Sequence, residues 1–93
     1  MPGLLSEMEI AHELPSVPTW SREGSAITCK RVFRDFAEAM NYVNRVAVVA
    51  EITDHHPDID IRWSTVLLSL STHSKGGLTE KDFTLARQID ALV

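Results

Sequence analysis

Three of the four histidines of this chain fall in two short segments, and they are the residues best suited to chemistry. The segment Asp54–Pro57 carries His55 and His56, and the segment Thr72–Thr79 carries His73. Because an imidazole titrates near neutral pH, one histidine can donate a proton while another accepts one. The clustering therefore predicts a site for acid–base chemistry that needs no cofactor.

Length and charge limit the classes of protein that this chain can belong to. With 93 residues and 44% hydrophobic content, the chain can form one small domain. So small a domain buries a modest fraction of its surface, and we expect it to form a homodimer or homotetramer. The 13 acidic and 9 basic residues give a net charge of −4, which opposes binding to nucleic-acid phosphates. We expect no direct nucleic-acid ligand.

The cysteine content and the N-terminus bear on the compartment. Cys29 is the only cysteine, so the chain forms no intrachain disulfide and no cysteine-based zinc site, as is typical of a reducing compartment. The N-terminal segment Met1–Leu5 has no basic stretch before an apolar run, and no apolar run is long enough to cross a bilayer. We expect a cytoplasmic protein without membrane contact.

Capping signals predict three helices. Ser6 with Glu9, and Thr79 with Asp82, have the spacing of a capping box, and Asp35 can cap a helix with Glu38 three residues on. The expected helices run from about 7 to 13, from 36 to about 53, and from 80 to the C-terminus. Their expected apolar positions are Ile10, Ala11 and Leu14; Phe36, Ala39, Met40, Val43, Val46, Ala47 and Ala50; and Phe83, Ala86, Ile89 and Val93.

Four strands are expected between these helices. The cluster Glu23-Gly24-Ser25 predicts a turn between two strands that follow Trp20, the second with Ile27, Cys29 and Phe33 on one face. Ile59–Thr65 and Val66–Thr72 are expected to form the other two, with His73 at the end of the last strand. Alternation puts Val66, Leu68 and Leu70 on one side. The order α-β-β-α-β-β-α predicts a single-domain α+β fold, residues 1–93, in which helices cover one face of a four-stranded antiparallel sheet.

An ordered set of motifs in this chain resembles the pterin-4a-carbinolamine dehydratase family, also called 4a-hydroxytetrahydrobiopterin dehydratases. The similarity extends from about Trp20 to Asp90. The motifs are Ala50-Glu51, Asp54-His55-His56-Pro57, Trp63-x-x-Val66, Leu70-Ser71-Thr72-His73, Gly76-Gly77-Leu78-Thr79 and Asp82. Arg31 stands where the family usually has an aromatic residue, and Thr19 precedes Trp20 where glycine is frequent; these departures bear on local packing or on an oligomer contact.

The resemblance implies a lyase that removes water from 4a-hydroxy-tetrahydropterin to give quinonoid dihydropterin, in tetrahydrobiopterin recycling, with no metal and no cofactor. His55, His56 and His73 match the catalytic positions of the family. We assign His56 as the base at N5, and His55 or His73 as the acid at the leaving oxygen. The expected substrate-binding residues are Glu51, Asp54, Ser71, Thr72 and Ser74.

Several alternatives stay open at this point. Capping already explains Asp82, and on that interpretation Asp82→Ala lowers stability and retains most turnover. Glu51 can steer a histidine, bind the pterin or be an ordinary surface charge, and Trp20 and Trp63 are expected to serve packing. The histidines could instead bind a metal ion, since neutral imidazole is a common metal ligand. Members of the family also act as transcriptional dimerisation cofactors or assembly proteins, so a protein partner is a second possible function.

Overall fold

The computed structural model describes residues 3–93; Met1 and Pro2, which belong to the N-terminal segment considered for a targeting signal, lie outside the described residues. The helices and strands follow the predicted order, with two short 3-10 helices added. They are α1 (Glu7–Glu13), η1 (Leu14–Ser16), β1 (Ser21–Glu23), β2 (Ala26–Val32), α2 (Phe36–Thr53), β3 (Asp58–Arg62), β4 (Thr65–Leu70), η2 (His73–Lys75) and α3 (Glu80–Asp90).

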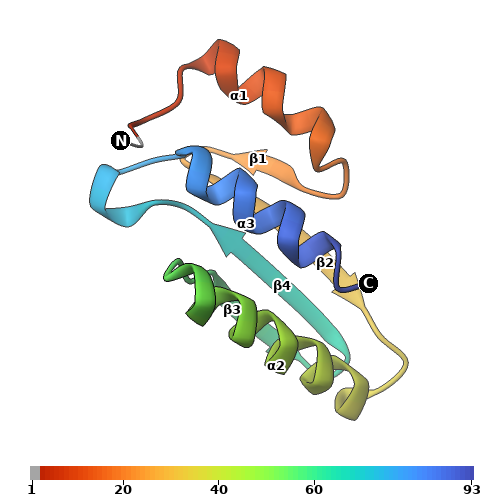
Figure 1. The fold of residues 1–93 in the computed structure, drawn as a ribbon. Helices are drawn as coiled ribbons and strands as arrows, with labels where there is room; N and C mark the ends of the chain where they lie inside the picture. Colours follow the sequence, from red (N-terminus) through yellow and green to blue (C-terminus); the bar gives the residue numbers. More distant parts are fainter. Residues whose placement is uncertain (1–2) are drawn as a thin grey trace.

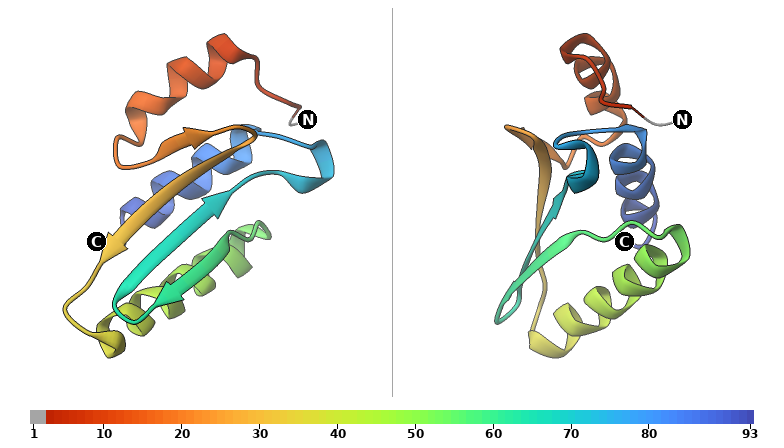
Figure 2. Two further views of the ribbon diagram at one scale, coloured as in Figure 1. Left: turned by 180° about the vertical axis from the view of Figure 1, so that it is seen from behind. Right: turned by 90° about the vertical axis from the view of Figure 1, so that its left-hand side faces the viewer.

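The four strands form one antiparallel sheet in the order β1-β2-β4-β3. Helices α2 and α3 lie side by side over one face of this sheet, and α1 lies beyond β1 at the edge of the sheet (Figures 1 and 2). The predicted α+β fold is therefore confirmed. No helix within residues 3–93 is long and apolar enough to span a membrane.

The helices begin where the capping signals predict. The Ser6 hydroxyl accepts from the Glu9 amide at 3.1 Å, and the Glu9 carboxylate accepts from the Ser6 amide at 2.8 Å. At α2, the Asp35 carboxylate accepts from the Glu38 amide at 2.8 Å. This hydrogen bond lowers the pKa of the Asp35 carboxyl. Three-residue spacing is thus enough to locate a helix start in this chain.

The core lies between the sheet and its two covering helices. Leu68 and Leu70 of β4 are buried opposite Cys29 and Ile27 of β2, as the alternation predicts. Tyr42 of α2 is also fully buried, although the expected apolar face of the helix did not include it. Ala11, Phe36, Ala47 and Val93 are exposed and are corrections to the predicted faces. Residues that repeat at three- and four-residue spacing cover more of the helix surface than the part that contacts the sheet.

The hairpin between β3 and β4 differs from the prediction. Its turn lies at Trp63 and Ser64, whereas the expected boundary was Thr65 to Val66. Trp63 has a φ of 53° and its side chain is 71% exposed, so it does not pack in the core. Trp20, by contrast, is buried as expected, and its indole N–H donates to Asp90 Oδ1 at 2.8 Å.

Arg31 has two polar partners under the helices, Tyr42 and Asp90. Its Nη2 donates to Asp90 Oδ1 at 2.6 Å, and its Nε donates to the Tyr42 hydroxyl at 3.3 Å. Burial raises the pKa of that hydroxyl, and burial also raises the pKa of the Cys29 thiol on the same strand. A carboxylate and a hydroxyl thus hold the Arg31 guanidinium beneath the helices.

Candidate active site

The end of α2 turns the first histidine segment back toward the protein. Asp54 adopts a left-handed conformation with φ 52° and ψ 43°, and the amide of His55 donates to the Ala50 carbonyl at 3.2 Å. This closes the helix in the manner of a left-handed C-cap. As a result the His55 side chain points inward and is only 12% exposed, whereas the neighbouring His56 is 53% exposed.

His55 is held by a buried carboxylate from α3. Its Nε2 lies 2.6 Å from Asp82 Oδ1, and the Asp82 side chain has no exposed surface. The other oxygen, Oδ2, accepts from the Thr72 hydroxyl at 2.8 Å and from the Thr79 amide at 2.9 Å. Because an ionised carboxylate only accepts, we infer that the Nε2 of His55 carries the hydrogen and that Nδ1 is left for other partners.

Asp82 therefore makes side-chain contacts beyond the helix cap that its spacing predicted. The capping box with Thr79 is present, as predicted. Its contact with His55, 27 residues away, was not predicted, and the interpretation of Asp82 as a cap alone is incomplete. One buried carboxylate joins the end of α2, the segment after β4 and the start of α3.

His56 forms a second, exposed pair with Glu51. His56 Nε2 lies 2.6 Å from Glu51 Oε2, and the Glu51 side chain is 77% exposed. Of the three possibilities that the sequence left open for Glu51, this contact favours steering of a histidine. Since the carboxylate accepts at Nε2, the Nδ1 of His56 is also left for other partners.

His73 lies in a tight loop, because β4 ends at Leu70 and His73 is the first residue of the 3-10 helix η2. The expected position at the end of a strand was therefore wrong. The Thr72 amide donates to the Gly77 carbonyl at 2.9 Å, and Gly76 has the left-handed φ of 74° that closes the loop. The loop presents the His73 side chain at the surface.

These segments surround one cavity of about 270 Å³. It is lined by Asp54, His55, His56, Ser71, Thr72, His73, Ser74 and Lys81. All three predicted histidines and all the expected substrate-binding residues except Glu51 thus converge here. The Ser71 hydroxyl donates to the Ser25 carbonyl at 2.8 Å, so its proton is already used.

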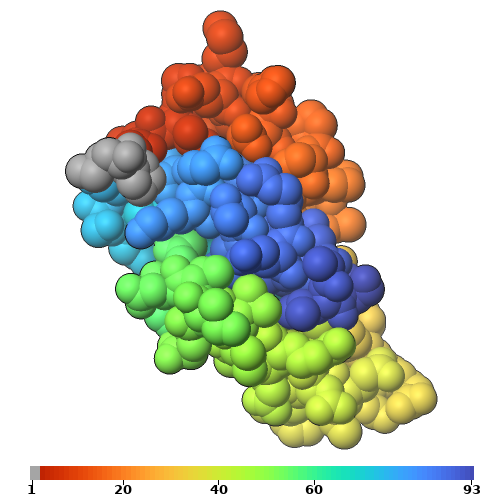
Figure 3. All heavy atoms as spheres, in the orientation of Figure 1, coloured from red at the N-terminus to blue at the C-terminus, as the bar shows by residue number. Residues whose placement is uncertain are grey.

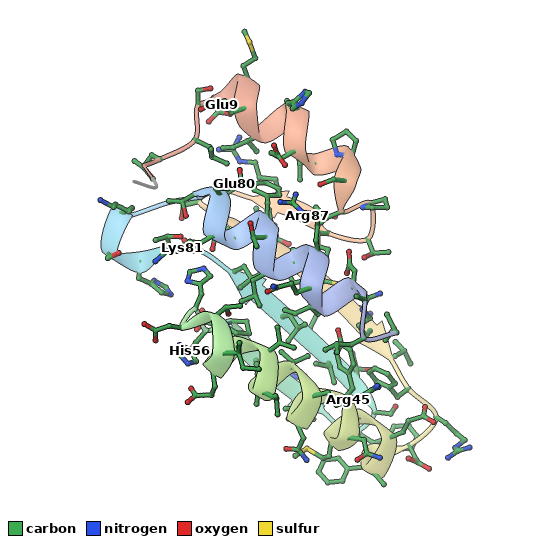
Figure 4. The ribbon with its side chains drawn as sticks, in the orientation of Figure 1. Glu9, Arg45, His56, Glu80, Lys81 and Arg87 are labelled. Atoms are coloured by element: carbon green, nitrogen blue, oxygen red, sulfur yellow. The ribbon has the colours of Figure 1, made fainter. Side chains whose placement is uncertain are left out.

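Lys81 is a lining residue that the sequence analysis missed. It lies in the first turn of α3, and Figure 4 shows it on the same side of the molecule as His56. The end of α2, the η2 loop and the start of α3 meet at this side of the surface (Figure 3). Only the packing of α3 beside η2 brings Lys81 to the cavity, and no local spacing signals it.

The same region offers no ready metal centre. Within residues 3–93, no group of three or more histidine, cysteine, aspartate or glutamate side chains is arranged to hold a metal ion. The arrangement that is present is two histidine–carboxylate pairs with a third histidine across the cavity, which is suited to moving protons.

Fold and site together define a small α+β protein with a cavity lined by three histidines. The sequence profile of the family described as pterin 4 alpha carbinolamine dehydratase matches residues 3–92. The chain belongs to this family.

Relatives from other organisms have similar sequences over nearly their whole length. A protein of Nocardia farcinica is 53% identical over 89 residues, which is 96% of this chain and 94% of the relative. A protein of Chloroflexus aurantiacus is 52% identical over 91 residues, 96% of each chain. Both bear the name pterin-4-alpha-carbinolamine dehydratase as a provisional assignment.

Two solved structures share the fold. The transcriptional coactivator/pterin dehydratase of Brucella melitensis superposes with a TM-score of 0.92 at 34% identity, covering 97% of this chain and 98% of that one. A pterin dehydratase-like protein, identified as a RuBisCO assembly factor in the alpha-carboxysome, gives a TM-score of 0.68 at 23% identity, covering 80% and 88%. The second likeness concerns the fold alone.

Proposed function

We propose that this protein is a dehydratase that eliminates water from 4a-hydroxy-tetrahydropterin and releases quinonoid dihydropterin, in the cytoplasmic recycling of tetrahydrobiopterin. The observation that carries the proposal is the convergence of His55, His56 and His73 on one cavity. Membership of the dehydratase family and the provisional names of the relatives support it.

The reaction needs two proton transfers and no redox step. The bond between C4a and its hydroxyl oxygen breaks, the proton on N5 is removed, and a double bond forms between C4a and N5. A base at N5 and an acid at the leaving oxygen therefore return the active site to its starting protonation once they exchange a proton with water. Each positioned transfer typically contributes about 10²–10⁴-fold in rate.

The two histidine–carboxylate pairs support an assignment of the base and the acid. With its Nε2 on Glu51, His56 has Nδ1 left to accept the N5 proton. Either His55, once its Nδ1 also carries a proton, or His73 then serves as the acid at the hydroxyl. Asp82 acts as a positioning residue in this scheme, because it holds the ring of His55 in one orientation and one tautomer.

Polar groups around the cavity supply binding contacts for the pterin. The amino-pyrimidine edge of the ring offers N–H donors that suit a carboxylate. Asp54 lines the cavity, whereas Glu51 lies outside the lining and is paired with His56. We therefore assign the edge contact to Asp54 and a hydroxyl contact to Ser74, because the Thr72 hydroxyl is already bonded to Asp82 and Thr79.

A rate measurement tests the proposal directly. Purified protein without added metal is mixed with chemically generated 4a-hydroxy-tetrahydropterin, and its dehydration is compared with the spontaneous rate. We expect faster dehydration, retained in His12→Ala, because His12 is exposed on α1 away from the cavity. A rate equal to the spontaneous one at micromolar protein would refute the proposal.

A protein-binding role is the second candidate. The Brucella melitensis protein, which is 34% identical to this chain, is described as a transcriptional coactivator as well as a pterin dehydratase. On the outer side of α2, Val48 is 59% exposed and Ile52 78%, so the helix offers an apolar contact surface. A gene for an aromatic amino-acid hydroxylase beside the gene for this chain would favour pterin recycling, and a host without any pterin-dependent hydroxylase would favour the binding role.

A further inference from the structure

The N-terminal segment packs against the η2 loop, which carries His73. The amide of Leu5 donates to the Leu78 carbonyl, at the end of this loop, at 2.9 Å. The Leu4 side chain lies against Gly77, where an added Cβ would come within 3.0 Å of Leu4 Cδ2. Figures 1 and 2 show the segment running beside the loop that joins β4 to α3. We call residues 3–5 the N-terminal strap.

We propose that the N-terminal strap holds the η2 loop in the position that presents His73 to the cavity, so that Leu4 and Leu5 are positioning residues for the reaction. This inference rests on the proposed function. Neither leucine lines the cavity, so both act through the backbone of the loop.

His73 depends on its loop more than the other two site histidines depend on theirs. The rings of His55 and His56 are each held by a carboxylate. The His73 ring is exposed, and the backbone of the η2 loop sets its place. In that backbone the Thr72 carbonyl accepts from the Lys75 amide at 2.9 Å. This bond closes the loop on itself but does not fix the loop relative to the cavity.

Two segments outside the η2 loop hold its two ends. At the start, the Ser71 hydroxyl donates to the Ser25 carbonyl in the turn between β1 and β2 at 2.8 Å. At the end, the Leu78 carbonyl accepts from the strap, and the Leu78 side chain is buried in the core. A shift of about 1 Å in a catalytic group can cost roughly 10²-fold in rate. A strap that fixes one end of this loop therefore bears on turnover.

Helix α1, which follows the strap, anchors it to the rest of the protein. Ile10 of α1 is buried in the core, and Glu7 Oε2 accepts from Arg22 Nη2 at 2.8 Å. At the other end of the helix, Arg87 Nη1 of α3 donates to Glu13 Oε1 at 3.1 Å. Because its far end is fixed, the strap can restrain the loop, whereas an unattached segment would only follow the motion of the loop.

Double-mutant cycles with His73 test the inference. Leu4→Ala removes the side chain that lies against Gly77, and Leu5→Pro removes the amide that donates to Leu78. Met8→Ala is the matched control, because Met8 is a large apolar residue that is 82% exposed on α1. Each substitution is made in the wild-type protein and in His73→Ala, and kcat is measured at a temperature where all variants are folded.

We expect each strap variant to lower kcat about tenfold when His73 is present, and to change the residual kcat of His73→Ala less than about twofold. Met8→Ala should change neither value. Equal losses with and without His73 would show general destabilisation, and wild-type kcat in both strap variants would show that the strap does not position the loop. Either result overturns the inference while the dehydratase stands.

Amide hydrogen exchange in the η2 loop is a second readout that needs no turnover. Exchange at Lys75 and Gly76 should be faster in both strap variants and unchanged in Met8→Ala. If the wild-type protein does not accelerate dehydration, the proposed function fails and this comparison decides the strap by itself. Faster exchange then supports the restraint of the loop, and unchanged exchange overturns it.

Discussion

Replacing Asp82 by asparagine separates its proposed role in orienting His55 from its role in capping α3. The two side chains have nearly the same shape, but the carboxylate accepts from His55 Nε2, Thr72 Oγ1 and the Thr79 amide, whereas asparagine has one acceptor oxygen and one N–H₂ donor. If the amide oxygen keeps the two contacts of Oδ2, its N–H₂ faces His55. The ring must then accept at Nε2 and carry its hydrogen on Nδ1.

The hydrogen bonds that the substitution changes give the expected losses of stability and rate. Hydrogen bonds to a charged group contribute about 1.5–3 kcal/mol and neutral ones about 0.5–1.5 kcal/mol, so we expect Asp82→Asn to lose roughly 1–3 kcal/mol of stability. For a domain of this size that lowers Tm by about 4–8 °C per kcal/mol. With its Nε2 accepting from the asparagine, His55 cannot hold protons on both nitrogens and loses its proposed role as the acid, so the catalysed rate should fall about 10²-fold or more, which is roughly 2.7 kcal/mol of transition-state stabilisation.

The assay combines three measurements on each variant: dehydration rate, thermal unfolding, and the ¹⁵N shifts of the His55 ring. Asp35→Ala is the matched control, because Asp35 caps α2 at the end of the helix away from the site and contacts no histidine. It should lower Tm and retain turnover at a temperature where it is folded.

Two results would contradict this reasoning. Wild-type turnover in Asp82→Asn, together with an unchanged His55 tautomer, would show that the carboxylate is only a cap, as spacing alone had indicated. A rate loss in Asp35→Ala as large as in Asp82→Asn would show that the loss reflects general destabilisation.

Three further predictions follow from the site and the surface. His56→Ala and His73→Ala should each lower the catalysed rate about 10²-fold or more with little change in Tm, because both rings are exposed; near-normal rates in both would overturn the assignment. The rate should survive EDTA, whereas loss with EDTA and recovery with one metal ion would favour a metal site. Light scattering at micromolar concentration should show a dimer or tetramer, because β1 and β3 are edge strands and one sheet face lacks helices; a monomer would count against this.

Local patterns in the sequence determined much of this protein. The helix starts followed from caps with partners three residues away, at Ser6, Asp35 and Thr79. The buried face of β4 followed from alternation. Both patterns depend on backbone geometry within a few residues, so they hold before any tertiary contact forms. The two histidine segments were also evident, although only a resemblance linked them to a reaction.

Tertiary packing determined which side chains these segments contact. The pairing of His55 with Asp82 spans 27 residues, and it exists because α2 and α3 lie side by side on the sheet. The same packing brings Lys81 to the cavity and opens a second hollow beside His55. Capping predicts where Asp82 lies along the helix but not which side chain meets its second oxygen. That partner is set by how the two helices pack, and a pattern confined to one helix carries no information about it.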